Sequence, residues 1–169
     1  LSPAGLELFG AGIRRGIKDF EYLELLKNGH MEFWTPLDEH FCYKQSKEEF
    51  SKRPTLYPYP VIEYPVTFLR LYKELVSKVL IESSLLINLC YVNIKGYNLL
   101  PYRPGSIGFT FRETSRVYDE RHIILPEMNV KSEFNSDKTA YDLIEQVFNS
   151  FGLEAKVIPF FTEEGFFKF

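Results

Sequence analysis

The stretch Leu85-Leu86-Ile87-Asn88-Leu89-Cys90-Tyr91-Val92-Asn93-Ile94 carries the strongest strand signal in the chain. It is rich in leucine, isoleucine, valine and tyrosine, which suit a pleated and partly buried surface. Lys95-Gly96 follows, and a glycine at this place is typical of a hairpin turn. The sequence therefore predicts a central strand over residues 85–94, paired antiparallel with a returning strand over residues 97–102.

Further elements are predicted on both sides of this hairpin. Short strands are indicated by alternation or by flanking turn residues, over residues 30–34, 107–111, 122–125 and 157–161. Apolar residues at three- and four-residue steps predict three longer helices, one from Ser2-Pro3 to Asn28-Gly29, one over residues 65–80, and one from Asn135 or Ser136 to Gly152. Together these elements predict a two-layer α+β domain, with a mainly antiparallel sheet packed against the helices.

The predicted first helix carries an unusual number of glycines. Gly5, Gly10, Gly12 and Gly16 each weaken a helix by about 1 kcal/mol relative to alanine. Close packing against another backbone is the simplest compensation. We therefore expect the Gly12 and Gly16 face to be covered, and a homo-oligomer formed through this helix is one way to cover it.

The composition predicts one globular domain over residues 1–169. The formal net charge is -3, which disfavours attraction of the whole surface to nucleic acid or to an anionic membrane. Only two cysteines occur, too few for a disulfide framework, and this favours the reducing cytoplasm. The apolar runs are too short to span a bilayer, so no membrane partner is expected. The first residue is Leu1 and not methionine, so we expect a fragment of a longer chain.

The segment over residues 41–60 is the first candidate binding site. It holds four cations against the two acids Glu48 and Glu49, and aromatic residues interleave with them. Cations beside stackable rings are what single-stranded nucleic acid binding uses. The predicted nucleic-acid contacts are Lys44, Lys47, Lys52, Arg53, Tyr57 and Tyr59. The alternative is a solvated short helix with inward aromatic side chains, followed by an extended connector over residues 57–60.

The loop over residues 101–108 is a second candidate. Its glycines would let backbone amides face an anion, with an arginine beside them. The predicted anion contacts are Arg103, Gly105 and Ser106. The loop lacks the Lys-Ser/Thr ending of a P-loop, so a plain hairpin connection is the alternative.

No stretch has the spacing of a metal site or a catalytic motif. His40 and Cys42 lie two residues apart, without the paired spacing of zinc ligands. The polar run over residues 112–122 contains acids, bases and a histidine, but its alternating charges are typical of a solvated loop. We therefore expect no metal, no other cofactor and no catalytic residue.

Two stretches carry a resemblance to a known family. They are Leu56-Tyr57-Pro58-Tyr59-Pro60 leading into Tyr64-Pro65-Val66-Thr67-Phe68-Leu69-Arg70-Leu71, and Val92-Asn93-Ile94-Lys95-Gly96-Tyr97. They resemble the region after the Schlafen-like AlbA_2 domain of bacterial DNA-binding proteins and transcriptional regulators. The resemblance covers a minority of the chain and transfers no functional residue. It implies an accessory domain, with the nucleic-acid-binding part lying before Leu1.

These observations favour a non-catalytic accessory or interaction domain of a bacterial cytoplasmic protein connected with nucleic acid or regulation. The alternative is a small-molecule-binding or enzymatic domain, for which the 17% aromatic content could line a pocket. A deep pocket lined by tyrosine and phenylalanine would favour the alternative. A shallow surface with an exposed apolar or basic patch would favour an interaction domain.

If the segment over residues 41–60 is exposed, the domain should bind single-stranded DNA at low salt and release it steeply as salt rises. Replacing Lys52 and Arg53 with alanine should weaken this binding, because each cation neutralises a phosphate, without unfolding the domain. Fluorescence anisotropy with a labelled oligonucleotide measures the effect. Absence of binding at low ionic strength would remove the hypothesis.

Overall fold

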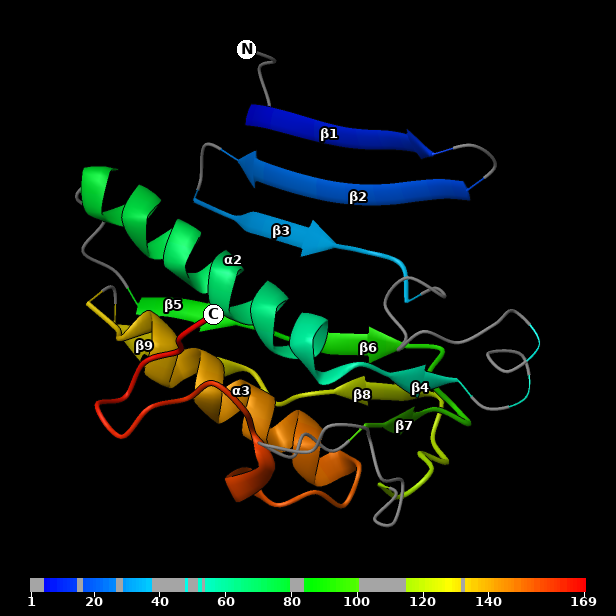
Figure 1. The fold of residues 1–169 in the computed structure, drawn as a ribbon. Helices are drawn as coiled ribbons and strands as arrows, with labels where there is room; N and C mark the ends of the chain where they lie inside the picture. The colour runs from blue at the N-terminus through cyan, green and yellow to red at the C-terminus, as the bar shows by residue number, and fades with distance from the viewer. Residues whose placement is uncertain are drawn as a thin grey trace. The chain divides into compact units, whose positions relative to one another are not determined.

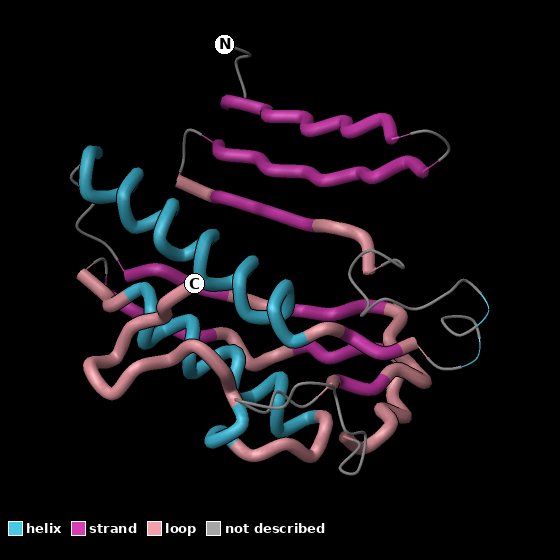
Figure 2. The backbone as a smooth tube through the Cα atoms, viewed as in Figure 1, coloured by secondary structure: helices cyan, strands magenta, loops and turns pink. Residues whose placement is uncertain are grey.

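The computed structural model of the chain describes residues 5–14, 17–26, 29–37, 48, 52, 54–79, 84–100, 115–131 and 133–169. For residues 5–14, 17–22 and 79 it describes the backbone alone. The chain divides into two compact units, Leu1–Asp38 and Glu39–Phe169, and each is described by itself. That the whole chain folds as one domain stays a prediction. Figures 1 and 2 show the elements of each unit.

The first unit is an antiparallel sheet in the order β1-β2-β3 (Figure 1). Its strands are β1 (Gly5–Arg14), β2 (Ile17–Leu26) and β3 (Met31–Trp34). Arg14 pairs with Ile17, so only two residues connect β1 to β2. At the next connection Gly29 has φ 86°, a conformation that glycine adopts without strain, and its N–H donates to the Leu26 carbonyl at 3.0 Å. The predicted strand over residues 30–34 is confirmed as β3.

The predicted first helix is wrong, because its residues form the β1–β2 hairpin. Four glycines between Gly5 and Gly16 would cost a helix about 4 kcal/mol relative to alanine. As a hairpin, the same residues form a ladder of ten paired positions. Among the described residues there are two α-helices and not three longer ones. The prediction of a homo-oligomer formed through this helix therefore loses its basis, because these residues form strands.

The second unit is built on a long antiparallel ribbon. Four short strands form it: β5 (Ser84–Ile87), β6 (Cys90–Val92), β8 (His122–Ile124) and β9 (Met128–Lys131). β5 pairs with β9 and β6 pairs with β8. Between the two pairings, the three residues 125–127 stand opposite the two residues 88 and 89, as in a β-bulge. Pro126, which has no N–H to donate, lies among the three.

The predicted hairpin of residues 85–94 with 97–102 is wrong in its pairing. Gly96 has φ 89° and the Tyr97 N–H donates to the Ile94 carbonyl, so a turn does form at Lys95-Gly96. The chain after the turn nevertheless stays beside the segment that leads into β8. The Gly96 N–H donates to the Tyr118 carbonyl, and the Tyr118 N–H donates to the Tyr97 carbonyl. The turn therefore bends the ribbon without reversing the chain.

The continuation, β7 (Asn98–Leu99), pairs in parallel with β4 (Thr55–Leu56). The predicted strand over residues 122–125, ending at Pro126, is confirmed as β8. The predicted edge strand over residues 157–161 is wrong, because a short 3-10 helix, η1 (Ala155–Val157), stands at its start. The predicted strand over residues 107–111 and the returning residues 101 and 102 lie outside the described residues.

Helix α2 (Pro58–Val79) begins seven residues before its predicted start. The run Tyr57-Pro58-Tyr59-Pro60 is therefore not an extended connector. Proline has a fixed helical φ, and the first N–H groups of a helix have no intrahelical acceptor, so prolines are tolerated in the first turn. Pro65 lies inside the helix, where it removes one backbone hydrogen bond.

Helix α3 (Ser136–Ser150) is close to its prediction. The Asn135 side chain accepts hydrogen bonds from the N–H groups of Asp137 and Lys138, both at 3.0 Å, which is N-capping. Gly152 has φ 73°, and its N–H and that of Leu153 donate to carbonyls of the last turn, which ends the helix.

The second unit is confirmed as α+β, with α2 and α3 on one side of its strands (Figure 2). Apolar residues of both helices and of the inner strand faces make the core. Its largest fully buried members are Phe148, Phe151, Leu56, Ile62, Ile94, Leu99, Leu143 and Ile144. None of the helices described here is both long and apolar enough to cross a membrane.

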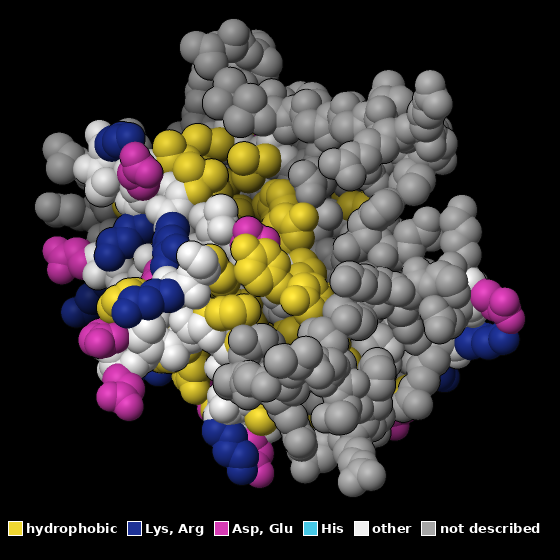
Figure 3. All heavy atoms as spheres, in the orientation of Figure 1, with side chains coloured by type: hydrophobic (Ala, Val, Ile, Leu, Met, Phe, Trp, Pro, Cys, Tyr) yellow, Lys and Arg dark blue, Asp and Glu magenta, His cyan; other side chains and the backbone are white. Residues whose placement is uncertain are grey.

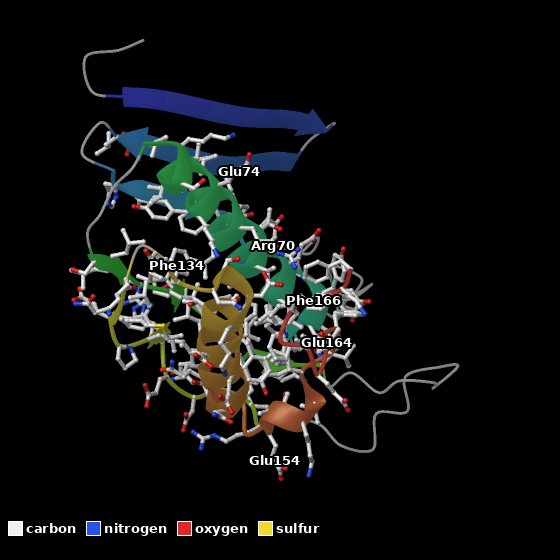
Figure 4. All side chains as sticks on the ribbon, turned by 90° about the vertical axis from the view of Figure 1, so that its left-hand side faces the viewer. Arg70, Glu74, Phe134, Glu154, Glu164 and Phe166 are labelled. Carbon is white, nitrogen blue, oxygen red and sulfur yellow. The ribbon has the colours of Figure 1, made fainter. Side chains whose placement is uncertain are left out.

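An ion pair with an additional backbone contact ties α2, α3 and the C-terminal segment together. Arg70 donates from Nε to Asp137 Oδ1 at 2.8 Å and from Nη2 to Asp137 Oδ2 at 2.6 Å. The Phe167 N–H donates to Asp137 Oδ2 at 2.8 Å, and the Phe167 carbonyl accepts from Arg70 Nη2 at 2.9 Å. Figure 4 shows Arg70 on α2 and Phe166 on the C-terminal segment beside it.

Replacing Asp137 with asparagine should lower the free energy of unfolding by about 2 kcal/mol. The side chain is 9% exposed, so its loss leaves Arg70 and the Phe167 N–H without a charged acceptor. The matched control is Asp142→Asn on the same helix, whose pair with Lys138 is 40–56% exposed. The control should change the free energy by about 0.5 kcal/mol or less. Urea denaturation measures both, and equal effects would contradict the assignment.

Acid should remove the contribution of the Asp137 carboxylate to the free energy of unfolding. The Arg70 hydrogen bond, with help from the Phe167 N–H, holds the pKa of the Asp137 carboxyl below its ordinary value despite burial. A lowered folded-state pKa stabilises the fold above the unfolded-state pKa, about 3.9, and this stabilisation is lost as the pH falls through the folded-state value. The stability difference between the parent and Asp137→Asn should stay constant from about pH 7 to 5 and shrink below about pH 4. Urea midpoints across this range test it.

Candidate functional site

An open groove of about 740 Å³ runs between the outer edge of β8 and the C-terminal half of α3. One wall is a continuous stretch of chain, and the other comes from one side of a helix. The lining residues are Tyr118, Glu120, Arg121, His122, Ile123, Ile124, Leu125 and Pro126 on the strand side and Gln146, Asn149 and Ser150 on the helix side. The groove is therefore open and has a continuous stretch of chain along one side.

The register of β6 and β8 determines which backbone groups face this groove. In an antiparallel pair, hydrogen-bonded residue pairs alternate with pairs whose N–H and C=O groups point away from the partner. The Leu125 N–H donates to the Leu89 carbonyl at 3.0 Å, so this pair is hydrogen-bonded. Ile124, the preceding residue, pairs with Cys90, and this pair is a non-hydrogen-bonded one. The Ile124 N–H and C=O therefore point away from β6, toward the free edge.

The same alternation applies to His122. Its carbonyl points to the free edge and accepts a hydrogen bond from the Tyr118 hydroxyl at 3.0 Å. Within the part of the chain that the structure describes, no group bonds to the His122 N–H or to the N–H and C=O of Ile124. Among the described residues, the edge of β8 thus presents a short row of backbone donors and acceptors without a protein partner.

Tyr118 closes one end of the groove. Its ring packs on Phe151 with the centroids 5.6 Å apart, and the neighbouring Arg116 N–H donates to the Phe151 carbonyl at 2.8 Å. Burial, followed by the nearby Glu120 carboxylate, raises the pKa of the Tyr118 hydroxyl above its ordinary value. The hydroxyl therefore stays protonated and keeps its bond to the strand. This end of the edge is held rigidly against α3.

Asn93 supports the strand from the side of β6. It has φ 58°, in the left-handed region, and its side-chain oxygen accepts from Arg121 Nε at 3.0 Å. The Asn93 N–H donates to His122 Nδ1 at 3.2 Å, so in neutral His122 the proton lies on Nε2. These contacts fix both side chains beside the open edge without using the outward backbone groups.

On the helix side of the groove the side chains are polar. Gln146 and Ser150 hydrogen-bond to carbonyls within their own helix, at 3.1 and 2.9 Å. Asn149 is exposed, and among the described residues its amide has no hydrogen-bond partner. This wall thus offers amide groups to whatever lies between α3 and β8.

The outer face of the ribbon, away from the helices, carries exposed apolar side chains among polar ones such as Asn129 and His122. Leu86, Val92 and Ile124 are 69%, 55% and 67% exposed, and Cys90 is exposed between them. Cys90 lies directly opposite Ile124 in the register. Exposed apolar residues that are neighbours on one surface mark an interaction surface more often than isolated ones do.

Of the six predicted nucleic-acid contacts the structure describes Lys52, Tyr57 and Tyr59, and the site as a whole stays a prediction. Lys44, Lys47 and Arg53 lie outside the described residues. Lys52 is exposed and pairs with Glu48 at 2.6 Å. On the face drawn in Figure 3, the basic and acidic side chains of the described residues are intermixed and form no basic patch.

Tyr57 and Tyr59, the other predicted contacts, belong to an aromatic cluster with the C-terminal segment. Their rings lie 6.4 Å apart, and Tyr59 makes edge contacts with Phe160 at 5.9 Å and Phe169 at 5.6 Å. The Tyr59 hydroxyl donates to the Glu63 carboxylate at 3.3 Å. These rings therefore pack against protein, although their role with nucleic acid stays a prediction.

The predicted anion contacts Arg103, Gly105 and Ser106 lie outside the described residues, as do His40 and Cys42. Among the residues that are described, no group of three metal-ligating side chains occurs. The expectation that the chain binds no metal is not tested by this.

Sequence reasoning missed the groove, because it assigned Asp119–His122 to a solvated loop. Two signals were present in the sequence. His122 to Leu125 already showed a short strand stopped by Pro126, which is typical of an edge. Gln146, Asn149 and Ser150 form a polar stripe at helical spacing beside the predicted buried face. Only the tertiary fold shows that the two lie side by side.

Comparison with known proteins gives no assignment. No family model, no curated protein and no solved structure matches the chain. The resemblance to the region after the AlbA_2 domain stays a prediction. The groove, the edge of β8 and the exposed apolar side chains are the features of the described residues that bear on function.

Proposed function

We propose that the chain is a non-catalytic protein-interaction module, and that it binds an extended segment of a partner protein along the edge of β8. The observation that carries the proposal is the outward orientation of the Ile124 N–H and C=O in an open groove. A backbone in extended conformation supplies matching acceptors and donors at the right spacing, as in other strand-addition complexes.

The groove leaves space for a further strand beside this edge. An added strand would lie about 5 Å from β8, in the space that α3 bounds on its other side. The outer edge of β6 also carries outward backbone groups, at Cys90 and Val92. The open groove lies beside β8, and the edge of β8 is therefore the better binding place.

The surface supports an interaction role more than small-molecule chemistry. A small-molecule site is typically a concave, mostly apolar pocket that encloses its ligand. The groove is open, and among its described lining residues Tyr118 is the single tyrosine, phenylalanine or tryptophan. The exposed Leu86, Val92 and Ile124 give the apolar surface that an interaction domain is expected to show. A parent protein that works in bacterial regulation with nucleic acid fits this role and remains part of the proposal.

Proline at position 124 should weaken the binding of peptides selected from a displayed library of linear sequences. Ile124→Pro removes the outward N–H but leaves the bonds between β6 and β8, and proline is tolerated at such edge positions. Loss of one backbone hydrogen bond should raise the Kd about tenfold. Isothermal titration calorimetry with a synthesised selected peptide measures it.

The matched control is Ile124→Val, which keeps both the N–H and an apolar side chain and should bind like the parent. A second variant, Asn149→Trp, leaves β8 intact and should fill the groove from the helix side, so it should also weaken binding. Circular dichroism confirms that each variant is folded. Peptides that bind Ile124→Pro and Asn149→Trp as tightly as the parent, or a selection that enriches no peptide, would refute the proposal.

A further inference from the structure

The outer face of the ribbon predicts which extended segments the edge of β8 accepts. In a strand, successive side chains point to opposite faces of the sheet, and directly opposite residues on neighbouring strands share a face. Ile123 is buried on the helix side, so Ile124 projects to the outer face, where it is 67% exposed. A residue of an added strand that stands opposite Ile124 must therefore project to the outer face too.

That position continues an existing apolar row. Cys90 and Ile124 face each other across β6 and β8, and Val92 lies diagonally next to Ile124 on the same face. A third side chain beside Ile124 would cover part of its exposed surface. Cross-strand contacts between apolar or β-branched side chains are favourable, whereas a charged side chain there would lose hydration without gaining a partner.

The residues on either side of that position face inward, to the wall made by α3. There they meet the Asn149 amide, which is without a partner among the described residues, and the half-buried Gln146. Buried polar groups need hydrogen-bond partners, so hydroxyl or amide side chains suit these inward positions. Large apolar side chains there would cover amides without satisfying them.

Resting on the proposed function, we infer that the partner segment is an amphipathic strand, with an apolar, preferably β-branched, residue beside Ile124 and small hydroxyl or amide residues before and after it. Both flanks of the open edge limit its length. The charged residues Glu120 and Arg121 come before the open edge of β8, and Pro126, which has no N–H to donate, comes after it. The recognised core is thus a short extended segment of alternating polarity.

Two peptides test the pattern. One is a nine-residue peptide of threonines with a single central valine, and the other has lysine in place of that valine. The parent protein should bind the valine peptide at least about threefold more tightly, within the range of a cross-strand apolar contact. In Ile124→Thr, which keeps the backbone edge but removes most of the apolar neighbour, this preference should nearly vanish.

Leu86→Thr is the matched control, because Leu86 lies on the same outer face but on β5, away from the added strand. Its preference for valine over lysine should equal that of the parent. Equal binding of both peptides by the parent, or a preference unchanged in Ile124→Thr, would overturn the inferred pattern while leaving strand addition standing. If neither peptide binds and library selection also fails, the proposed function itself is wrong.

Discussion

The second unit depends on the Asp137 carboxylate, which joins three parts of the chain that are far apart in sequence. Arg70 reaches it from α2, Asp137 itself lies in the first turn of α3, and the Phe167 N–H reaches it from the C-terminal segment. Asp137 also lies at the N-terminus of α3, where the helix dipole favours a negative charge. One buried carboxylate thus fixes how the two helices and the chain end lie together.

The groove follows from this arrangement. The Arg70–Asp137 pair holds the first turn of α3 against α2, and the Arg116 N–H at the other end of the helix bonds to the Phe151 carbonyl. The helix is therefore held at both ends, and its last turns stay beside β8. A binding surface placed between two rigid elements loses little conformational freedom on binding, which favours recognition of a flexible segment.

Local signals were sufficient where a single element was concerned. The cap at Asn135 or Ser136, the Gly152 end of α3 and the end of β8 before Pro126 are predicted correctly, because each depends on neighbouring residues alone. The prediction of the first helix is wrong because it followed the apolar residues at three- and four-residue steps and gave too little weight to the helix-breaking glycines. Once two strands are allowed, the same residues pair along their whole length.

The partner of a strand could not be read from the sequence in the same way. Gly96 does form a turn, yet the chain on both sides of it pairs with residues 118–131, and no local pattern distinguishes such a bend from a reversal. The groove was beyond prediction for the same reason, since it exists only because β8 and α3 meet. Strand positions were predictable from residue type, whereas pairing depended on the tertiary fold.

The pairing of β5 with β9 has a consequence for how the chain is made. Ser84 pairs with Lys131, so a ribosome must add about 47 residues after Ser84 before its partner exists. Until then, a leucine- and isoleucine-rich segment has no strand to pair with, and non-local pairing of this kind folds slowly. During synthesis the β5–β6 segment is therefore exposed to wrong pairing until β8 and β9 have been made.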